Sequence, residues 1–504
     1  MATDRCRHAR WGAIGILWVF ALWHSWEVRA LFNDGAVFFI AAVHQQSPVH
    51  FYPARDYAML AMQLPLTLAL RLGVTDLNWL ARLLSFGMFA LPTAIYHLAL
   101  VRAREDAALL AAVIMAIAAI FMTTSFSIVG EYNTACALAV LAAVLLTGKT
   151  RPSVIDALLL VAVAVFALRV YETFVFLGPA LAAMALWTVR RGHCPGDGFA
   201  VSGVLRAALL LGFMAVVCLV SLIGRYAVFL PVGLILVVAA TWAVVRVSAR
   251  PLVARGLVVL AAALFAASAA VAVQSLVSFV EPGRLEHAAL WTLSLNIQFY
   301  LAVGSVLVVA VWALARADDL ATNKPYRWAG VGLVLLALSP LMTLAGQTLG
   351  AMAYGQDSVR GVAALVVLAM VLVMWAYRSE WNGRPKALVR LRSAPAALRL
   401  LTWAFLMLVA SLPADVVLTR ASSSFLQVMR STIRDRSGLI PFEETRLAEP
   451  SFADLFDGWS AVSQSLAMRS KPGDGIVLPP KDYTGPVAHN PFSPPDLGRY
   501  FWRD

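Results

Sequence analysis

Long apolar runs separated by short polar segments dominate this chain of 504 residues. A membrane-spanning helix needs about 17–25 mostly apolar residues in succession. By that criterion the pattern predicts about thirteen spanning helices and an all-α polytopic membrane protein. They are expected near residues 11–31, 79–101, 107–127, 134–148, 154–170, 173–189, 203–223, 227–245, 256–278, 298–315, 328–346, 361–377 and 399–418.

One further apolar segment is expected to lie on the bilayer rather than cross it. Residues 56–73, DYAMLAMQLPLTLALRLG, contain Pro65 and end close to Arg71. If this segment spanned the membrane, the alternation of basic and non-basic loops would fail. The sequence therefore predicts an interfacial helix on the outer leaflet. The first outer loop then covers about residues 32–78 and is largely helical.

Basic residues predict the orientation of the spans. Arg5, Arg7 and Arg10 precede the first span, and Lys and Arg recur in alternate loops. Such loops face the cytoplasm, so the N-terminus is expected inside and, with an odd number of spans, the C-terminus outside. We expect a membrane domain over residues 1–419 and a small, polar extracytoplasmic tail over 420–504, with a helix near 451–468 and little apolar surface for a core of its own.

Composition supports the membrane assignment. Hydrophobic residues make up 61% of the chain and charged residues 13%, whereas soluble domains have about half and a quarter. The net charge of +12 is spread over short loops, which argues against nucleic-acid binding. Neither the cysteines nor the outer-face histidines His44, His50 and His287 show the spacing of a metal site. No cofactor is expected, and a divalent metal is kept as an alternative.

The predicted topology gathers acidic and aromatic residues on the outer face. Asp34 follows the first span, Glu131 precedes the fourth, and Arg169 and Glu172 lie in the next outer turn. Each has a purely structural alternative. Asp34 could cap a helix beginning at Gly35. Glu131 could favour a helix N-terminus through the macrodipole, and Arg169 with Glu172 could be a local ion pair.

The order of these features resembles the GT-C superfamily of integral-membrane glycosyltransferases. An acid after the first helix, Asp34, is followed by a Pro-containing interfacial helix and then by LGVTDLNWLARL. The pair Glu131-Tyr132 opens the fourth span. The resemblance is to bacterial aminoarabinose, arabinofuranosyl and mannosyl transferases. It covers about residues 10–190, and Asn33-Asp34-Gly35 stands where the family has an Asp or Asp-Glu.

This resemblance implies a polyprenyl-phosphate sugar donor and a glycan, glycolipid or protein acceptor on the outer face of the bacterial inner membrane. Because phosphate is a good leaving group, one carboxylate acting as general base on the acceptor hydroxyl is enough for inversion. Asp34 is the expected base, and Glu131 is the second candidate catalytic residue. Arginine binds phosphate through two parallel hydrogen bonds. The phosphate-binding candidates are Arg55, Arg169, Arg284 and Arg360, and the substrate-positioning candidates are Tyr132, Glu172 and Tyr354.

Two other functions fit the same hydropathy. The chain could be a carrier or flippase for a lipid-linked glycan, or a membrane assembly partner without catalysis. A transporter places ionisable residues near the middle of the bilayer. Most charges here lie at the ends of the spans, which favours a site at the membrane surface.

Overall fold

A computed structural model describes residues 2–124, 130–147, 153–191, 251–279, 367–375 and 394–503, apart from 369, 454 and 486. The chain is mainly α-helical there, as the apolar pattern predicts. Three of the described helices are long and apolar enough to cross a membrane: Leu77–Arg102, Val253–Ser275 and Pro395–Asp435. The expected spans at 203–223, 227–245, 298–315 and 328–346 lie outside the described residues, and 361–377 is described in part.

The N-terminal half begins with one long helix and a helical loop. Its elements are α1 (Ala2–Trp26), η1 (Arg29–Leu31), α2 (Asp34–Gln45), η2 (Pro53–Arg55), α3 (Asp56–Arg71) and α4 (Leu77–Arg102). The first span was expected over residues 11–31, but α1 ends at Trp26. Val28 has a φ of 46°, a rare value for a β-branched residue, and the chain turns there into η1.

The next described helices, up to α19, coincide with long apolar segments of the sequence. They are α5 (Ala107–Ala116), a π-helical turn (Ile117–Phe121), α6 (Met122–Thr124), α7 (Glu131–Thr147), α8 (Val154–Ala167), α9 (Phe174–Arg191), α12 (Pro251–Phe279) and α19 (Ala394–Asp435). Side chains fix several helix starts. The Asp76 carboxylate accepts from the amide of Asn78 at 2.9 Å, and Asp106 and Ser153 cap α5 and α8 similarly.

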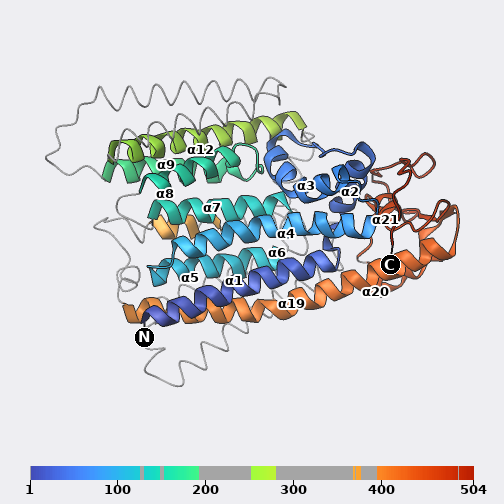
Figure 1. Cartoon of the computed structure of the whole chain (residues 1–504), viewed down its shortest axis with the longest axis horizontal. Coiled ribbons are helices and arrows are strands. Elements are labelled where there is room, and N and C mark those ends of the chain that lie inside the picture. Colours follow the sequence, from blue (N-terminus) through green and yellow to red (C-terminus); the bar gives the residue numbers. More distant parts are fainter. Residues whose placement is uncertain are drawn as a thin grey trace, which may run out of the picture.

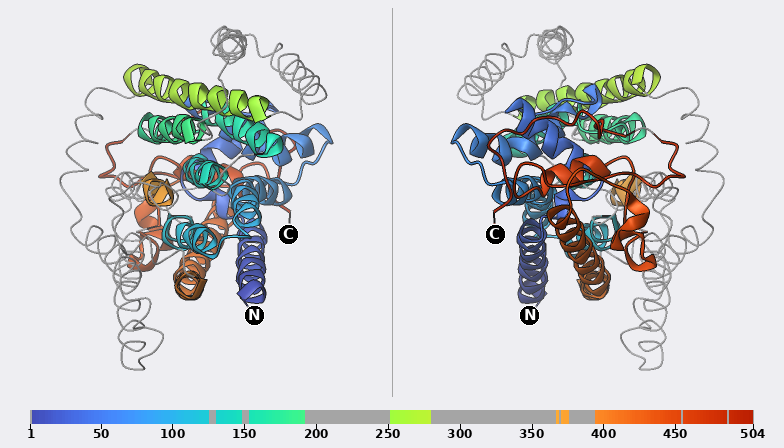
Figure 2. Two further views of the ribbon diagram at one scale, coloured as in Figure 1. Left: turned by 90° about the vertical axis from the view of Figure 1, so that its left-hand side faces the viewer. Right: turned by 90° about the vertical axis from the view of Figure 1, so that its right-hand side faces the viewer.

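The helices form a bundle with a distinct cap at one end. In Figure 1, α1, α4, α5, α7 and α19 run side by side, while α2, α3 and α21 gather at the end opposite the N-terminus. Seen along the bundle, α12 and α9 lie on one side, and α1 and α19 lie on the other (Figure 2). Every residue of α7 is buried, so this helix forms the centre.

The segment expected as an interfacial helix is helical, as α3. It packs on α4 at Gly87, where an added Cβ would collide with the carbonyl oxygen of Met62. On its other side, Leu64, Leu68 and Leu72 are exposed at a spacing of four residues. This spacing places Leu64 and Leu68 on one helix face, and Leu72 follows directly after the helix end. An exposed apolar face is what a helix lying on a bilayer presents.

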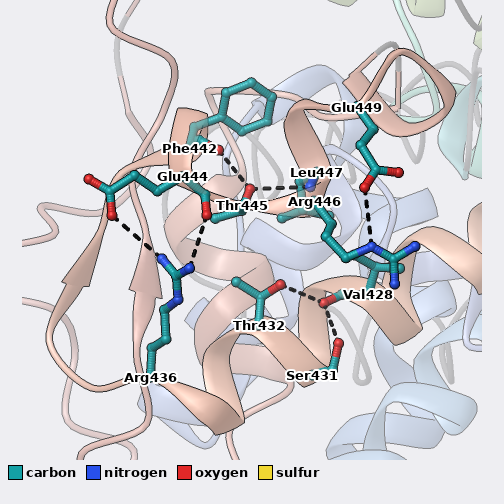
Figure 3. Close-up of polar contacts among 10 residues, drawn as sticks. All are labelled: Val428, Ser431, Thr432, Arg436, Phe442, Glu444, Thr445, Arg446, Leu447 and Glu449. Atoms are coloured by element: carbon teal, nitrogen blue, oxygen red, sulfur yellow. Dashed lines mark hydrogen bonds and ion pairs between the residues drawn. The ribbon is translucent and has the colours of Figure 1, made fainter.

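The C-terminal segment continues directly from the bundle. The expected boundary at residue 419 falls inside α19, which extends to Asp435 and is followed by β1 (Leu439–Ile440). β1 pairs in parallel with β2 (Ile476–Val477). Figure 3 shows how polar contacts order this region: Arg436 donates to the carbonyl oxygen of Glu444 at 3.1 Å, and Arg446 contacts Glu449 at 3.2 Å.

In place of one helix near 451–468, the segment contains short helices. They are η4 (Phe442–Glu444), η5 (Arg446–Ala448), α20 (Pro450–Ala453) and α21 (Ala461–Ala467). The chain turns between α20 and α21 because the Asp457 carboxylate accepts from the amide of Trp459 at 3.2 Å, a local bond that competes with helix formation.

The C-terminal segment is joined to the first loop and shares the core of the bundle. α21 packs on α2, and the Gln464 side chain donates to the carbonyl oxygen of Leu31 at 3.2 Å. Further on, the amide of Leu77 donates to Phe501 at 3.0 Å. Buried side chains such as Leu466 belong to the same hydrophobic cluster as side chains of α1, α4 and α19. As expected, the described part of the C-terminal segment has no core of its own. Its apolar side chains pack on the rest of the chain instead.

Candidate active site

Asp34 is presented at the start of α2 by a tight turn. The preceding Asn33 is the N-cap residue, with a φ of 53° and no side-chain capping bond. A Cβ at Gly35 would collide with the carbonyl oxygen of Ala30, so the turn requires glycine there. Asp34 itself is exposed and lies in the first helical turn, where the macrodipole favours a negative charge. The capping alternative for Asp34 is therefore not what the structure shows.

The C-terminal segment places a second carboxylate beside Asp34. Asp457 lies four residues before α21, the helix that packs on α2. Burial raises the pKa of Asp457 above its usual value, and the negative charge of Asp34 adds to this rise. Oδ1 of Asp457 accepts from the amide of Trp459, whereas its buried Oδ2 has no hydrogen-bond partner among the described residues.

Tyr483 lies next to Asp457. A Cβ on Gly458 would come within 2.7 Å of the Tyr483 ring, so glycine lets the ring approach the backbone there. Burial raises the pKa of Tyr483, and Asp457 adds to this. Neither residue was predicted from the sequence. Both lie more than 400 positions from Asp34, and no motif marks them.

A second group of charged residues forms around Arg55, at the start of α3. Nε of Arg55 donates to both carboxylate oxygens of Glu172 at 2.9 Å, and its NH1 lies 3.4 Å from Oε1 of Glu131. The guanidinium also lies 4.4 Å from the Tyr52 ring centroid and 4.5 Å from that of Tyr171. The Arg55 side chain is 17% exposed and that of Glu172 10%. Three outer segments predicted to share one face therefore meet at this arginine.

The partners of Arg55 keep it ionised. Burial alone would lower the pKa of Arg55, but Tyr171, Glu172 and Glu131 more than offset that effect, and the net direction is upward. Glu131 is buried at the first position of α7. Its location fits the macrodipole alternative, but Glu131 also contacts the Arg55 guanidinium.

Arg169 belongs to the same region but pairs with another element. Its NH1 lies 3.0 Å from Oδ2 of Asp56, and the other oxygen of Asp56 is 3.3 Å from Nδ1 of His50. The local alternative paired Arg169 with Glu172. The structure instead links Arg169 to α3, and Glu172 to Arg55. Both contacts tie the turn between α8 and α9 to the first loop.

The network limits what Arg55 and Arg169 can bind. Two guanidinium groups face the three carboxylates of Asp56, Glu131 and Glu172, so the group carries net negative charge when all are ionised. A phosphate would have to displace a carboxylate already in contact. These arginines are therefore better described as joining the loops than as an open phosphate site.

The other predicted site residues divide into two sets. Tyr132 is buried beside the network, with its ring edge-on to that of Tyr171 at 5.4 Å. Arg284, Arg360 and Tyr354 lie outside the described residues. Within the part that is described, no group of three or more His, Cys, Asp or Glu side chains is arranged to hold a metal ion.

No family model, curated protein or solved structure matches this chain. The described part has three helices able to cross a membrane by length and composition. Two groups of its side chains bring predicted site residues together with further acids or aromatics: Asp34 with Asp457 and Tyr483, and Arg55 with Glu131 and Glu172. Function is therefore inferred from the chemistry of these two groups.

Proposed function

We propose that this chain is an inverting glycosyltransferase of the bacterial inner membrane, with about thirteen spanning helices and a cytoplasmic N-terminus. It transfers a sugar from a polyprenyl-phosphate donor to a cell-envelope glycan, glycolipid or protein on the outer face. The resemblance of residues 10–190 to the GT-C superfamily motivates the donor class. The exposure of Asp34 at the start of α2, which lies at the end of the bundle opposite the N-terminus (Figure 1), is the observation that carries the proposal.

Asp34 is the proposed general base. A base must reach the acceptor hydroxyl, and Asp34 is exposed in the loop that follows the first helix. Glu131 is buried and in contact with Arg55, so its proposed role is to hold the loops that surround Asp34. Glu172 and Tyr132 support the same network.

The donor phosphate needs an arginine that is not already bound to a carboxylate. Arg55 and Arg169 are each in contact with carboxylates. We therefore assign phosphate binding to Arg284 and Arg360, which the predicted topology places on the outer face. Tyr354, close to Arg360 in sequence, remains the proposed substrate-positioning residue.

The decisive experiment replaces Asp34 with Asn. Asn33 stays as the N-cap and Asp34 is exposed, so Asp34→Asn should fold and insert normally. A positioned general base contributes about 10²–10⁴-fold in rate. We expect Asp34→Asn to slow transfer by about that factor. The measurement is transfer from a panel of labelled polyprenyl-phosphate sugars into envelope lipid extract, with purified protein in detergent.

Glu449→Gln is the matched control, because Glu449 is a half-exposed acid of the C-terminal segment. It should retain native turnover. Near-native turnover by Asp34→Asn would exclude Asp34 as the base. No turnover by the native protein with any donor in the panel would count against the transferase assignment itself.

One observation favours the alternative of a carrier for lipid-linked glycans. Nε2 of His24 in α1 lies 3.1 Å from Oδ2 of Asp415 in α19, and both side chains are almost fully buried. Buried ionisable pairs between spanning helices often mark transport pathways. His24 is two residues from the end of α1, however, and not at its centre. Transport of a labelled lipid-linked glycan into protein-containing vesicles, lost in Asp415→Asn but not in Asp34→Asn, would establish the carrier.

A further inference from the structure

Arg82 of α4 is enclosed by two tryptophan rings. Its guanidinium carbon lies 3.9 Å from the ring centroid of Trp26, the last residue of α1, and 5.2 Å from that of Trp79. Both distances are within the range of cation–π attraction. Trp26 is 61% exposed and Trp79 is 54% exposed. The cation therefore lies beside two tryptophan residues that are each more than half exposed.

No carboxylate neutralises Arg82 among the described residues. Its Nε is buried with no acceptor in that part of the chain, and no hydrogen bond there uses its terminal nitrogens. The backbone at this position is fixed, because Ser25 donates to the carbonyl oxygen of Arg82 at 2.8 Å. The site is thus a rigidly placed positive charge with donors available for an anion.

The position of the Arg82 site along the bundle suggests the kind of anion. Trp26 ends α1 and Trp79 is in the first turn of α4, so both lie toward the end of the bundle opposite the N-terminus (Figure 1). Tryptophan is enriched where spanning helices reach the lipid headgroups. The neighbouring α3 exposes Leu64 and Leu68. Lipid phosphate is the anion found at this depth.

We propose that Trp26, Arg82 and Trp79 bind the phosphate of an anionic glycerophospholipid in the leaflet at this end of the bundle. Arg82 donates two hydrogen bonds to phosphate oxygens, as the planar guanidinium fork allows. The indole rings cover the upper part of the acyl chains. This site requires membrane insertion and is independent of the transferase activity.

A resident phospholipid fits the Arg82 site better than the sugar donor. The donor phosphate must lie beside the general base, whereas none of the described ion pairs connects Arg82 with Asp34, Glu131 or Glu172. Both indole rings are exposed, as expected for a site on the lipid-facing perimeter.

The test measures lipid selectivity of the full chain reconstituted with spin-labelled lipids. Three probes are compared in phosphatidylcholine vesicles: labelled phosphatidylglycerol, labelled phosphatidylcholine and labelled polyprenyl phosphate. The native protein should prefer phosphatidylglycerol. Arg82→Gln should lower that preference by about tenfold, because it removes charge-assisted hydrogen bonds to the phosphate. Arg82→Lys, which keeps the charge but loses the fork, should fall between them.

Arg71→Gln is the matched control, because Arg71 is an exposed cation at the end of α3. It should keep the native preference. Trp79→Leu, which retains apolar surface, should weaken the preference if the ring stack holds the cation. The proposal is overturned if the native protein shows no preference for phosphatidylglycerol, if Arg82→Gln retains it, if Arg71→Gln loses it equally, or if polyprenyl phosphate alone responds to Arg82→Gln.

Discussion

Glu172 makes the closest contact to Arg55, and its replacement by Gln tests whether the Arg55 network holds the loops together. Breaking a buried ion pair by removing one partner costs about 3–5 kcal/mol. Here the side chains retain 10–17% exposure, Gln still accepts one hydrogen bond, and Glu131 remains 3.4 Å from the same guanidinium. These three features reduce the expected loss to about 2 kcal/mol of unfolding free energy.

Glu172→Gln is compared with the native protein by denaturant unfolding in mild detergent, with helix content as the signal that reports unfolding. Glu131→Gln should cost less, about 1 kcal/mol, because its contact is longer. Both acids bind one arginine, so the double variant should show a coupling energy rather than simple addition. Glu449→Gln, which breaks an exposed pair with Arg446, should be near neutral. Native stability in Glu172→Gln would refute the reasoning.

Two further predictions concern pH. Burial raises the pKa of Asp457 above its usual value of 3.8, so the folded state holds this proton more tightly than the unfolded state does. The free energy of unfolding therefore falls as the pH rises above 3.8. Asp457→Asn should therefore gain stability relative to the native protein between pH 4 and 7 in denaturant titrations; a constant difference would contradict this. Burial lowers the pKa of His489 below its usual 6.5, and the nearby His44 lowers it further. The stabilisation of the folded state by neutral His489 is therefore complete above pH 6.5 and is lost as the pH falls below that value. Acidification to pH 5 should increase proteolysis of the C-terminal segment, less so in His489→Gln, with His8→Gln behaving as native.

Hydropathy was enough to locate the long apolar helices of the described bundle. The predicted spans near 79–101, 154–170 and 173–189 correspond closely to α4, α8 and α9, because a run of apolar residues of that length has few other stable arrangements in lipid. Pro65 does not prevent α3 from being helical. The helix ends were less accurate, as at Trp26, since they depend on side-chain caps and turns that hydropathy does not record.

The alternation of basic and non-basic loops also predicted that several site residues share one end of the bundle. It placed Arg55, Glu131 and Glu172 on one face, and these three side chains are in contact. It could not indicate which acid pairs with which arginine, because that depends on how loops fold against one another. The local pairing of Arg169 with Glu172 gave way to Asp56, a partner more than 100 residues away.

The C-terminal segment was the least predictable part. Its polar, Pro-rich sequence indicated a tail, and nothing in it showed that α21 would pack on α2. Tertiary contacts of this kind join positions far apart in the chain. A single sequence gives no periodic signal for them.

The docked C-terminal segment changes how the proposed reaction is organised. Gln464 anchors α21 to Leu31, three residues before Asp34, so Asp457 and Tyr483 lie beside the proposed base. In the proposed reaction, an acceptor bound at Asp34 would therefore be close to Asp457, with Tyr483 next to that carboxylate. Glu131, in contact with Arg55 and buried, has no comparable access. The contacts of Arg55 join the loops, whereas Asp34 is exposed beside the C-terminal segment. Under the proposed function, acceptor selection would therefore depend on α2 and the C-terminal segment rather than on the Arg55 network.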